Sequence, residues 1–220
     1  RIVDQKFEAI RNQSFEEGKE LNRYFTLLPD YSPLKKAYCE VLEMPVGDER
    51  TAAESNLKAL LVKGDIDVNI MSKVDKVNKN AFGESKGDEF TDACASLRGF
   101  ANSTLQSSLV LSAGMNSRLY SYLEAFDCFL PTSQGEFSKK IILKVSDFRS
   151  AFIQAKFLAK KGVWVSEFRI ESGLNCGGHA FATDGFLLGP ILDEFKAKKS
   201  EMIQELFTLY KAGLATRGCE

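Results

Sequence analysis

The segment with the clearest chemical potential is a glycine pair followed directly by the only histidine of the chain, Gly177-Gly178-His179. Two adjacent glycines remove the Cβ atoms that would hold a ligand away from the main chain, and they allow positive φ at little steric cost. A histidine with an ordinary pKa of about 6.5 can take up or release a proton close to neutral pH. The three residues therefore combine a bare docking surface with a general base.

Two simpler interpretations apply to the same segment. Gly177-Gly178-His179 also fits a tight loop in which the imidazole hydrogen-bonds a backbone carbonyl and no ligand is involved. The preceding Cys176 could act as a nucleophile, but no second base lies nearby in the sequence, which favours a small buried side chain. The predicted strands and helices around the segment are needed to distinguish a ligand-binding site from a loop that binds no ligand.

The composition is that of an ordinary globular protein. The 220 residues are 44% hydrophobic and 27% charged, and Lys plus Arg number 29 against 30 Asp plus Glu. The net charge of −1 gives no electrostatic reason to bind nucleic acid or an anionic membrane. No apolar run reaches the roughly 18 residues needed to span a bilayer, and no signal peptide is visible. We therefore expect a cytoplasmic protein with no nucleic-acid or membrane partner.

The cysteines and the chain ends add two expectations. The five cysteines are odd in number, widely scattered and without a C-x-x-C pair. This pattern argues against a disulfide framework and a zinc site, so reduced thiols and no metal are expected. The chain starts at Arg1 without an initiator methionine and stops at Glu220 just after a helical pattern, from which we expect a piece of a longer protein.

Residues 1–64 are predicted to form a helical extension. Apolar residues recur at helical spacing, and prolines interrupt the run at Pro29 and Pro33. A short helix is expected over 33–44, a turn over 45–48 and another helix over 51–62.

From residue 65 onward, short β-branched segments alternate with amphipathic ones. Strands are predicted over 66–73, 108–113, 140–145 and 165–171. Helices are predicted over 88–104, 116–126 and 149–161, the last with an N-cap at Ser146-Asp147, and a long final helix is expected to follow Gly189-Pro190 and to end at a Gly213 cap. This alternation predicts a parallel α/β sheet with right-handed crossovers.

The ends of the four predicted strands carry polar residues. Ligands bind beyond the carboxyl ends of strands in parallel sheets. The residues at these ends are Asn69, Ser112 with Gly114, Lys144, and the segment from Glu171 to His179. Their convergence on one rim favours a binding site over a satisfied loop.

The order of four motifs resembles a known family. The motifs are DVNIM, LVLSAGMNSRL, IILKVSDFRSA and FRIESGLNCGGHAF. In this order they resemble the 2-nitropropane dioxygenase, or nitronate monooxygenase, family of FMN-dependent (β/α)₈ (TIM) barrels. The resemblance covers about residues 65–181 and implies a partial TIM barrel of about four parallel strand-helix units, 65–220, behind the helical extension.

The resemblance also implies roles for individual residues. His179 matches the family's catalytic histidine, and Lys144 is expected near the electron-rich edge of the flavin or in an ion pair with Asp147. The expected flavin contacts are Asn69, Lys144, Glu171, Gly177 and Gly178. One extra residue lies between Glu171 and Gly177, so the match at Glu171 depends on the placement of the gap.

The implied activity is that of an FMN-dependent oxidoreductase. His179 would remove a proton α to a nitro group, or orient a nitronate, on a small-molecule substrate. A complete barrel takes about 250 residues and holds phosphate on the loops after strands 7 and 8. We therefore expect the phosphate site outside this chain, with the missing half of the barrel or another subunit as partner, and the fragment inactive alone. The alternatives are a related flavin barrel acting as an enoyl-thioester reductase or synthase-linked domain, and a non-catalytic barrel fragment that binds a ligand or partner.

Overall fold

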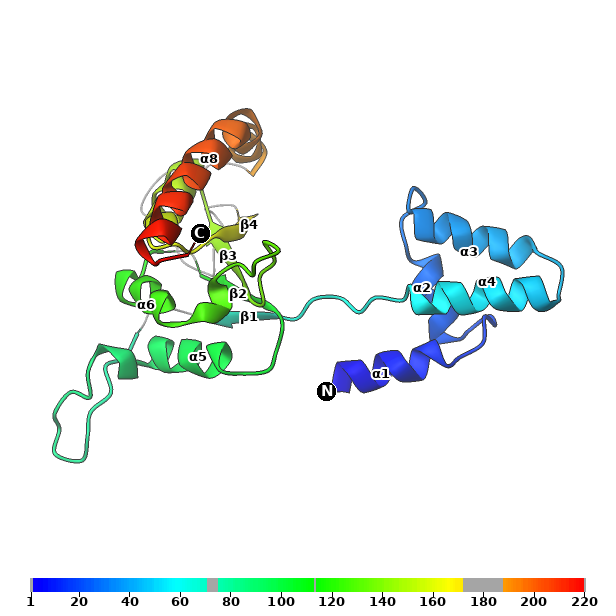
Figure 1. Ribbon diagram of the computed structural model, residues 1–220, viewed down its shortest axis with the longest axis horizontal. Coiled ribbons are helices and arrows are strands. Elements are labelled where there is room, and N and C mark those ends of the chain that lie inside the picture. Colours follow the sequence, from blue (N-terminus) through cyan, green and yellow to red (C-terminus); the bar gives the residue numbers. More distant parts are fainter. Residues whose placement is uncertain (1, 71–74, 113, 172–187, 220) are drawn as a thin grey trace. The chain divides into compact units, whose positions relative to one another are not determined.

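The chain divides into two compact units, Arg1–Gly64 and Asp65–Glu220. The computed structural model, drawn in Figure 1, describes residues 2–70, 75–112, 114–171 and 188–219. Each unit has its own hydrophobic core. The two units are therefore treated one at a time.

The regular secondary structure in the described residues of the first unit is helical. Pro33 stands at the first position of its helix, where its fixed φ favours the helix and its missing N–H removes no hydrogen bond. Helices this short are marginal alone, so their stability comes from the core they share. That core contains Phe25 stacked on Tyr38, with ring centroids 5.2 Å apart. The helices are α1 (Ile2–Arg11), α2 (Glu20–Thr26), α3 (Pro33–Glu43) and α4 (Asp48–Ala59).

The second unit is built on a four-stranded parallel sheet. Its strands are β1 (Asp67–Ile70), β2 (Ser108–Leu111), β3 (Lys140–Val145) and β4 (Val165–Ile170), and they lie in the spatial order β1-β2-β3-β4. Each neighbouring pair is parallel. The prediction of a parallel α/β unit is confirmed.

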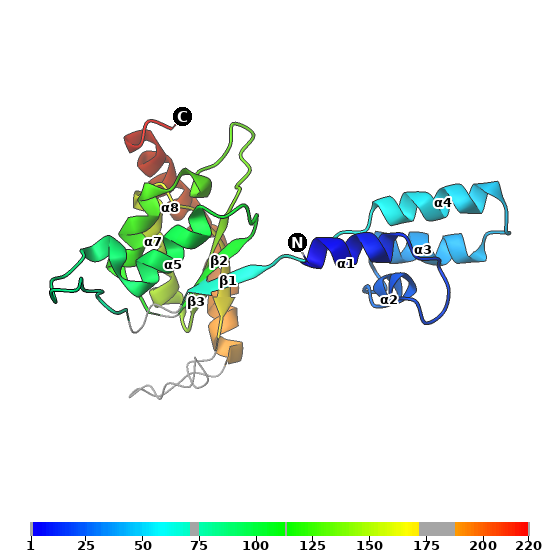
Figure 2. The ribbon, with the colours of Figure 1, turned by 90° about the horizontal axis from the view of Figure 1, so that it is seen from below.

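Helical segments that connect or follow these strands cover one face of the sheet. Figure 2 shows α5 and α7 on the same side of the strands. The covered face is apolar, with Ile70, Leu111 and Leu143 buried against the helices. The segments are η1 (Asp88–Phe90), α5 (Asp92–Ala101), α6 (Ser117–Tyr122), η2 (Leu123–Ala125), η3 (Asp127–Phe129), α7 (Phe148–Lys160) and α8 (Leu188–Thr216).

Side-chain caps fix where the helices after the strands begin. The Asp147 carboxylate accepts a hydrogen bond from the Ser150 N–H at 2.7 Å, as the predicted cap requires. The Asn116 side chain accepts in the same way from the Leu119 N–H at 3.1 Å. Each cap satisfies one of the free N–H groups of a first helical turn.

Several predicted helix boundaries are wrong. The helix expected over 51–62 is α4, which runs from Asp48 to Ala59. The segment expected over 88–104 begins with the short 3₁₀ helix η1, and α5 starts at Asp92. Gly213 does not cap the final helix, because α8 continues to Thr216. A Cβ on Gly213 would lie 2.5 Å from the Ala159 carbonyl oxygen, so this glycine serves a close approach of α8 to the end of α7.

Candidate strand-end site

The face of the sheet opposite the helices is largely polar. Side chains alternate along a strand, so the neighbours of Ile70, Leu111 and Leu143 point to the other side. One row across this side, fixed by the strand register, is Asn69, Val110, Ile142 and Glu167. We call this side the polar face, and its members on the four strands are Asp67, Asn69, Ser108, Val110, Lys140, Ile142, Lys144, Glu167 and Arg169.

An ion pair crosses the polar face from one outer strand to the other. Arg169 on β4 donates through Nη2 to Asp67 Oδ2 on β1, at 2.5 Å. Three inter-strand steps of about 4.8 Å would separate these strands by roughly 14 Å in a flat sheet. The pair is also displaced along the strands, so its span exceeds the combined reach of the two side chains. The sheet must therefore coil toward its polar face.

Arg169 contacts a second carboxylate on its own strand. Its Nε donates to Glu167 Oε1 at 2.8 Å. The hydrogen bonds to Asp67 and then to Glu167 raise the pKa of the guanidinium above its ordinary value. Arg169 therefore remains a cation between two acids on this face.

A second ion pair lies at the carboxyl ends of β3 and β4. The Lys144 ammonium is 2.8 Å from Glu171 Oε1, and the two side chains are 22% and 33% exposed. The expected alternative pairing of Lys144 with Asp147 does not occur, because the Asp147 carboxylate caps α7 and accepts from the Ser146 hydroxyl. The structure thus brings together two residues predicted for the site.

The remaining predicted residues divide between the polar face and the undescribed part of the chain. Asn69 is exposed on the polar face, in the same row as Glu167. Gly177, Gly178 and His179, with Cys176, lie outside the described residues. The geometry of the site is therefore given by Asn69, Lys144 and Glu171.

Asp75 is a residue of this rim that the sequence did not reveal. Its carboxylate accepts from the Ala93 N–H at 3.0 Å and from the Asn116 side-chain amide at 3.3 Å. Arg118 is 3.8 Å away and is held in turn by Asp88 at 3.2 Å. Asp75 ties the segment after β1 to the starts of α5 and α6. A lone acid in a polar segment gives no signal of such a role in the sequence.

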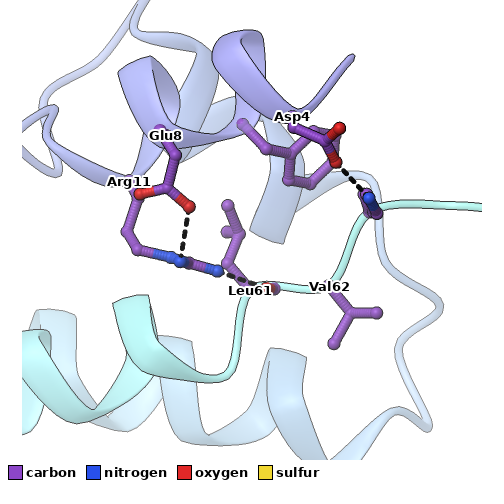
Figure 3. A pocket seen from close by; sticks show the side chains of 7 residues that line it. Asp4, Glu8, Arg11, Leu61 and Val62 are labelled. Atoms are coloured by element: carbon purple, nitrogen blue, oxygen red, sulfur yellow. Dashed lines mark hydrogen bonds and ion pairs between the residues drawn. The ribbon is translucent and has the colours of Figure 1, made fainter. Parts of the chain in front are cut away.

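Figure 3 shows a pocket on the helical unit, lined mainly by α1 and the residues after α4. Arg11 donates to Glu8 at 2.8 Å and to the Leu61 carbonyl at 3.1 Å. Lys63 binds Asp4, and this hydrogen bond is the main cause that lowers the pKa of Asp4 to about 2. These charged side chains bond to one another and to the backbone, and they hold α1 against the segment after α4. The pocket is therefore best explained as a gap where these two segments pack together.

The strand-end arrangement can offer a ligand an amide, an ammonium and a carboxylate on one face. Such groups suit recognition of a polar ring edge or a small anion. Within the described ranges, no set of three acidic, histidine or cysteine side chains is placed to hold a metal ion. No helix among the described residues combines the length and the apolar character needed to cross a membrane.

Comparisons with known proteins found no matching family model, no matching curated protein and no matching solved structure.

Proposed function

We propose that the second unit is part of an FMN-dependent oxidoreductase of the nitronate monooxygenase type, acting on a carbon acid or nitronate. One observation carries the proposal: four parallel strands in consecutive order place Asn69, Lys144 and Glu171 on one face toward their carboxyl ends. Ligands of parallel α/β folds bind at these ends. His179 follows β4 in the sequence and is proposed as the base.

The proposed barrel is supported by the stagger of the Asp67–Arg169 pair. Asp67 precedes the register row of Asn69 and Glu167 by two residues, and Arg169 follows it by two. The pair is therefore displaced by four residues over three strand steps. A (β/α)₈ barrel has a shear of about eight over eight strands, which is about one residue a step. The observed displacement is close to the three residues expected for that closure.

The described residues fit the ring edge of a flavin. A neighbouring cation stabilises the electron-rich edge of the isoalloxazine. The Lys144 ammonium is partly exposed at the strand ends and could serve as this cation. The Asn69 amide can both donate to and accept from ring nitrogen and oxygen atoms. Bound FMN would supply electron exchange with the substrate and an acceptor. The phosphate contacts are assigned to sequence beyond these residues, as the family resemblance implies.

In the proposed reaction, His179 accepts the proton from the carbon next to a nitro group. Proton abstraction by a positioned base contributes typically 10²–10⁴-fold to a rate. Gly177 and Gly178 would let the ring approach the main chain closely. Glu171 holds Lys144 in place, and so fixes the cation beside the ring.

The first test is FMN binding by the full-length protein and its Lys144→Met variant. We expect the substitution to weaken FMN binding at least tenfold. The matched control is Lys161→Met, because Lys161 is 23% exposed and is also paired with a glutamate, Glu124, at 3.2 Å. Equal FMN affinity in wild type and Lys144→Met would refute the assigned contact.

The second test addresses the base. His179→Ala should retain bound FMN and lose turnover of neutral nitroalkanes by at least 100-fold, in line with the loss of a general base. Turnover of the preformed nitronate, which needs no deprotonation, should fall much less. Unchanged nitroalkane turnover would refute the role of His179.

A further inference from the structure

The Asp67–Arg169 ion pair lies directly beneath two of the site residues. On β1, Asp67 is two positions before Asn69, so both side chains point to the polar face. On β4, Arg169 is two positions before Glu171, whose N–H still bonds to the Val145 carbonyl in continuation of the sheet at 2.9 Å. The ion pair therefore joins the two outer strands one side-chain step below Asn69 and Glu171.

The arginine is suited to hold a fixed span. Its planar guanidinium reaches Asp67 with one nitrogen and Glu167 with another, at 2.5 and 2.8 Å. A rigid fork between two carboxylates defines an orientation that a lysine ammonium cannot. Between the outer strands, Val110 and Ile142 on the same face are only 2% and 3% exposed. The pair thus spans a packed part of the polar face.

We propose that Arg169 is a positioning residue for the strand-end site. By holding β1 to β4 through Asp67, it sets the separation of Asn69 from the Lys144–Glu171 pair, and with it the width of the ligand site. The identity of the ligand in this inference rests on the proposed function. Backbone hydrogen bonds through β2 and β3 fix the distance between adjacent strands. The curvature of the whole sheet, in contrast, depends on a contact between the outer strands β1 and β4.

FMN is the probe for the first experiment, with the full-length protein. Arg169→Met keeps the apolar stem and removes the charge, and Asp67→Asn keeps the shape of the acid. Each single variant should weaken FMN binding about tenfold and shift the visible spectrum of the bound flavin. The double variant should bind FMN no more weakly than Arg169→Met alone, because that single change already removes the contact between the two side chains. Arg169→Lys should recover part of the affinity.

The control for a general loss of stability is Glu124→Gln. This change breaks the Lys161–Glu124 ion pair, which does not lie on the polar face. It should leave the affinity and spectrum of bound FMN unchanged. FMN affinity and spectrum unaffected by Arg169→Met would overturn the inference.

A second measurement does not need FMN. Spin labels at two exposed positions, Ile66→Cys just before β1 and Ser166→Cys within β4, report the β1 to β4 distance by pulsed EPR once the native cysteines are replaced. Arg169→Met should lengthen or broaden this distance. An unchanged distance would overturn the inference, whereas a changed distance in a protein that binds no FMN would refute the proposed function and retain the positioning role.

Discussion

The Arg169 guanidinium on β4 bonds to the Asp67 carboxylate on β1, two residues that are 102 positions apart in the sequence and at opposite edges of the sheet. The contact requires the four strands to coil toward their polar face. The contact therefore links the curvature of the sheet to the arrangement of Asn69, Lys144 and Glu171 toward the carboxyl ends of the strands.

The stability of this pair is tested by a double-mutant cycle of Asp67→Asn and Arg169→Met. The side chains are 24% and 40% exposed, so each single change should lower the free energy of unfolding only slightly. The double variant should lose less than the sum of the two single losses, as measured by urea denaturation. Strictly additive losses would show that the two residues do not interact in solution.

Gly213 is predicted to be essential for packing α8 on α7. A Cβ there would lie 2.6 Å from the Gly162 amide nitrogen and 2.9 Å from the Lys160 carbonyl oxygen. Gly213→Ala should therefore lower the free energy of unfolding by about 1–3 kcal/mol, the typical cost of overpacking.

The control for Gly213 is Gly99→Ala within α5, where a Cβ would meet nothing within 4 Å. Because alanine favours the helix more than this exposed glycine, Gly99→Ala should raise the free energy of unfolding by up to about 1 kcal/mol. Equal thermal shifts in the two variants would contradict the close approach of the helices.

Two buried tyrosines are predicted to respond oppositely to loss of the hydroxyl. The Tyr120 hydroxyl donates to the Gln154 side chain at 2.6 Å, so Tyr120→Phe leaves a buried amide oxygen unpaired and should cost about 1–3 kcal/mol. The Tyr210 hydroxyl is buried without a hydrogen-bond partner among the described residues. Tyr210→Phe should therefore be neutral or stabilising, as measured by thermal melting.

Tyr210 also gives an expectation for high pH. Burial is the main cause that raises its pKa from 10.0 to about 12. The folded state then keeps a proton that the unfolded state releases, so this contribution is present below pH 10 and is lost as pH rises toward 12. Tyr210→Phe should reduce the loss of stability over that range, and an identical alkaline profile would contradict the burial of the hydroxyl.

The helical unit should show an acid-dependent link between Asp4 and Lys63. The pKa of Asp4 is lowered from 3.8 to about 2, chiefly by its hydrogen bond to Lys63. The stabilisation is therefore present above about pH 4 and is lost as pH falls toward 2. An NMR titration of the Asp4 carboxyl carbon should move to a higher midpoint in Lys63→Met and stay unchanged in Lys35→Met, since Lys35 binds Asp30. A midpoint near 4 in the wild type would contradict the contact.

Local sequence patterns predicted the strands and several helix starts correctly. Short β-branched segments between amphipathic ones located β1 to β4. Asp147 was recognised as an N-cap because its type and place before an apolar helix suffice. The shared rim of Lys144 and Glu171 followed from the rule that parallel strands end at one edge.

Features that depend on contacts between distant segments were not predictable in this way. Gly213 has the type of a helix cap, and only the proximity of α7 shows its packing role. Asp67 and Arg169 have ordinary polar types, and their pairing depends on the coil of the sheet. Asp75 likewise acquires its partners from α5 and α6.

The central claim, a flavin at the carboxyl ends of these strands, is tested most directly by the visible absorption spectrum of the full-length protein as purified. We predict the two absorption bands of bound flavin, with FMN released on denaturation. A colourless protein that acquires no flavin bands after incubation with FMN would contradict the claim.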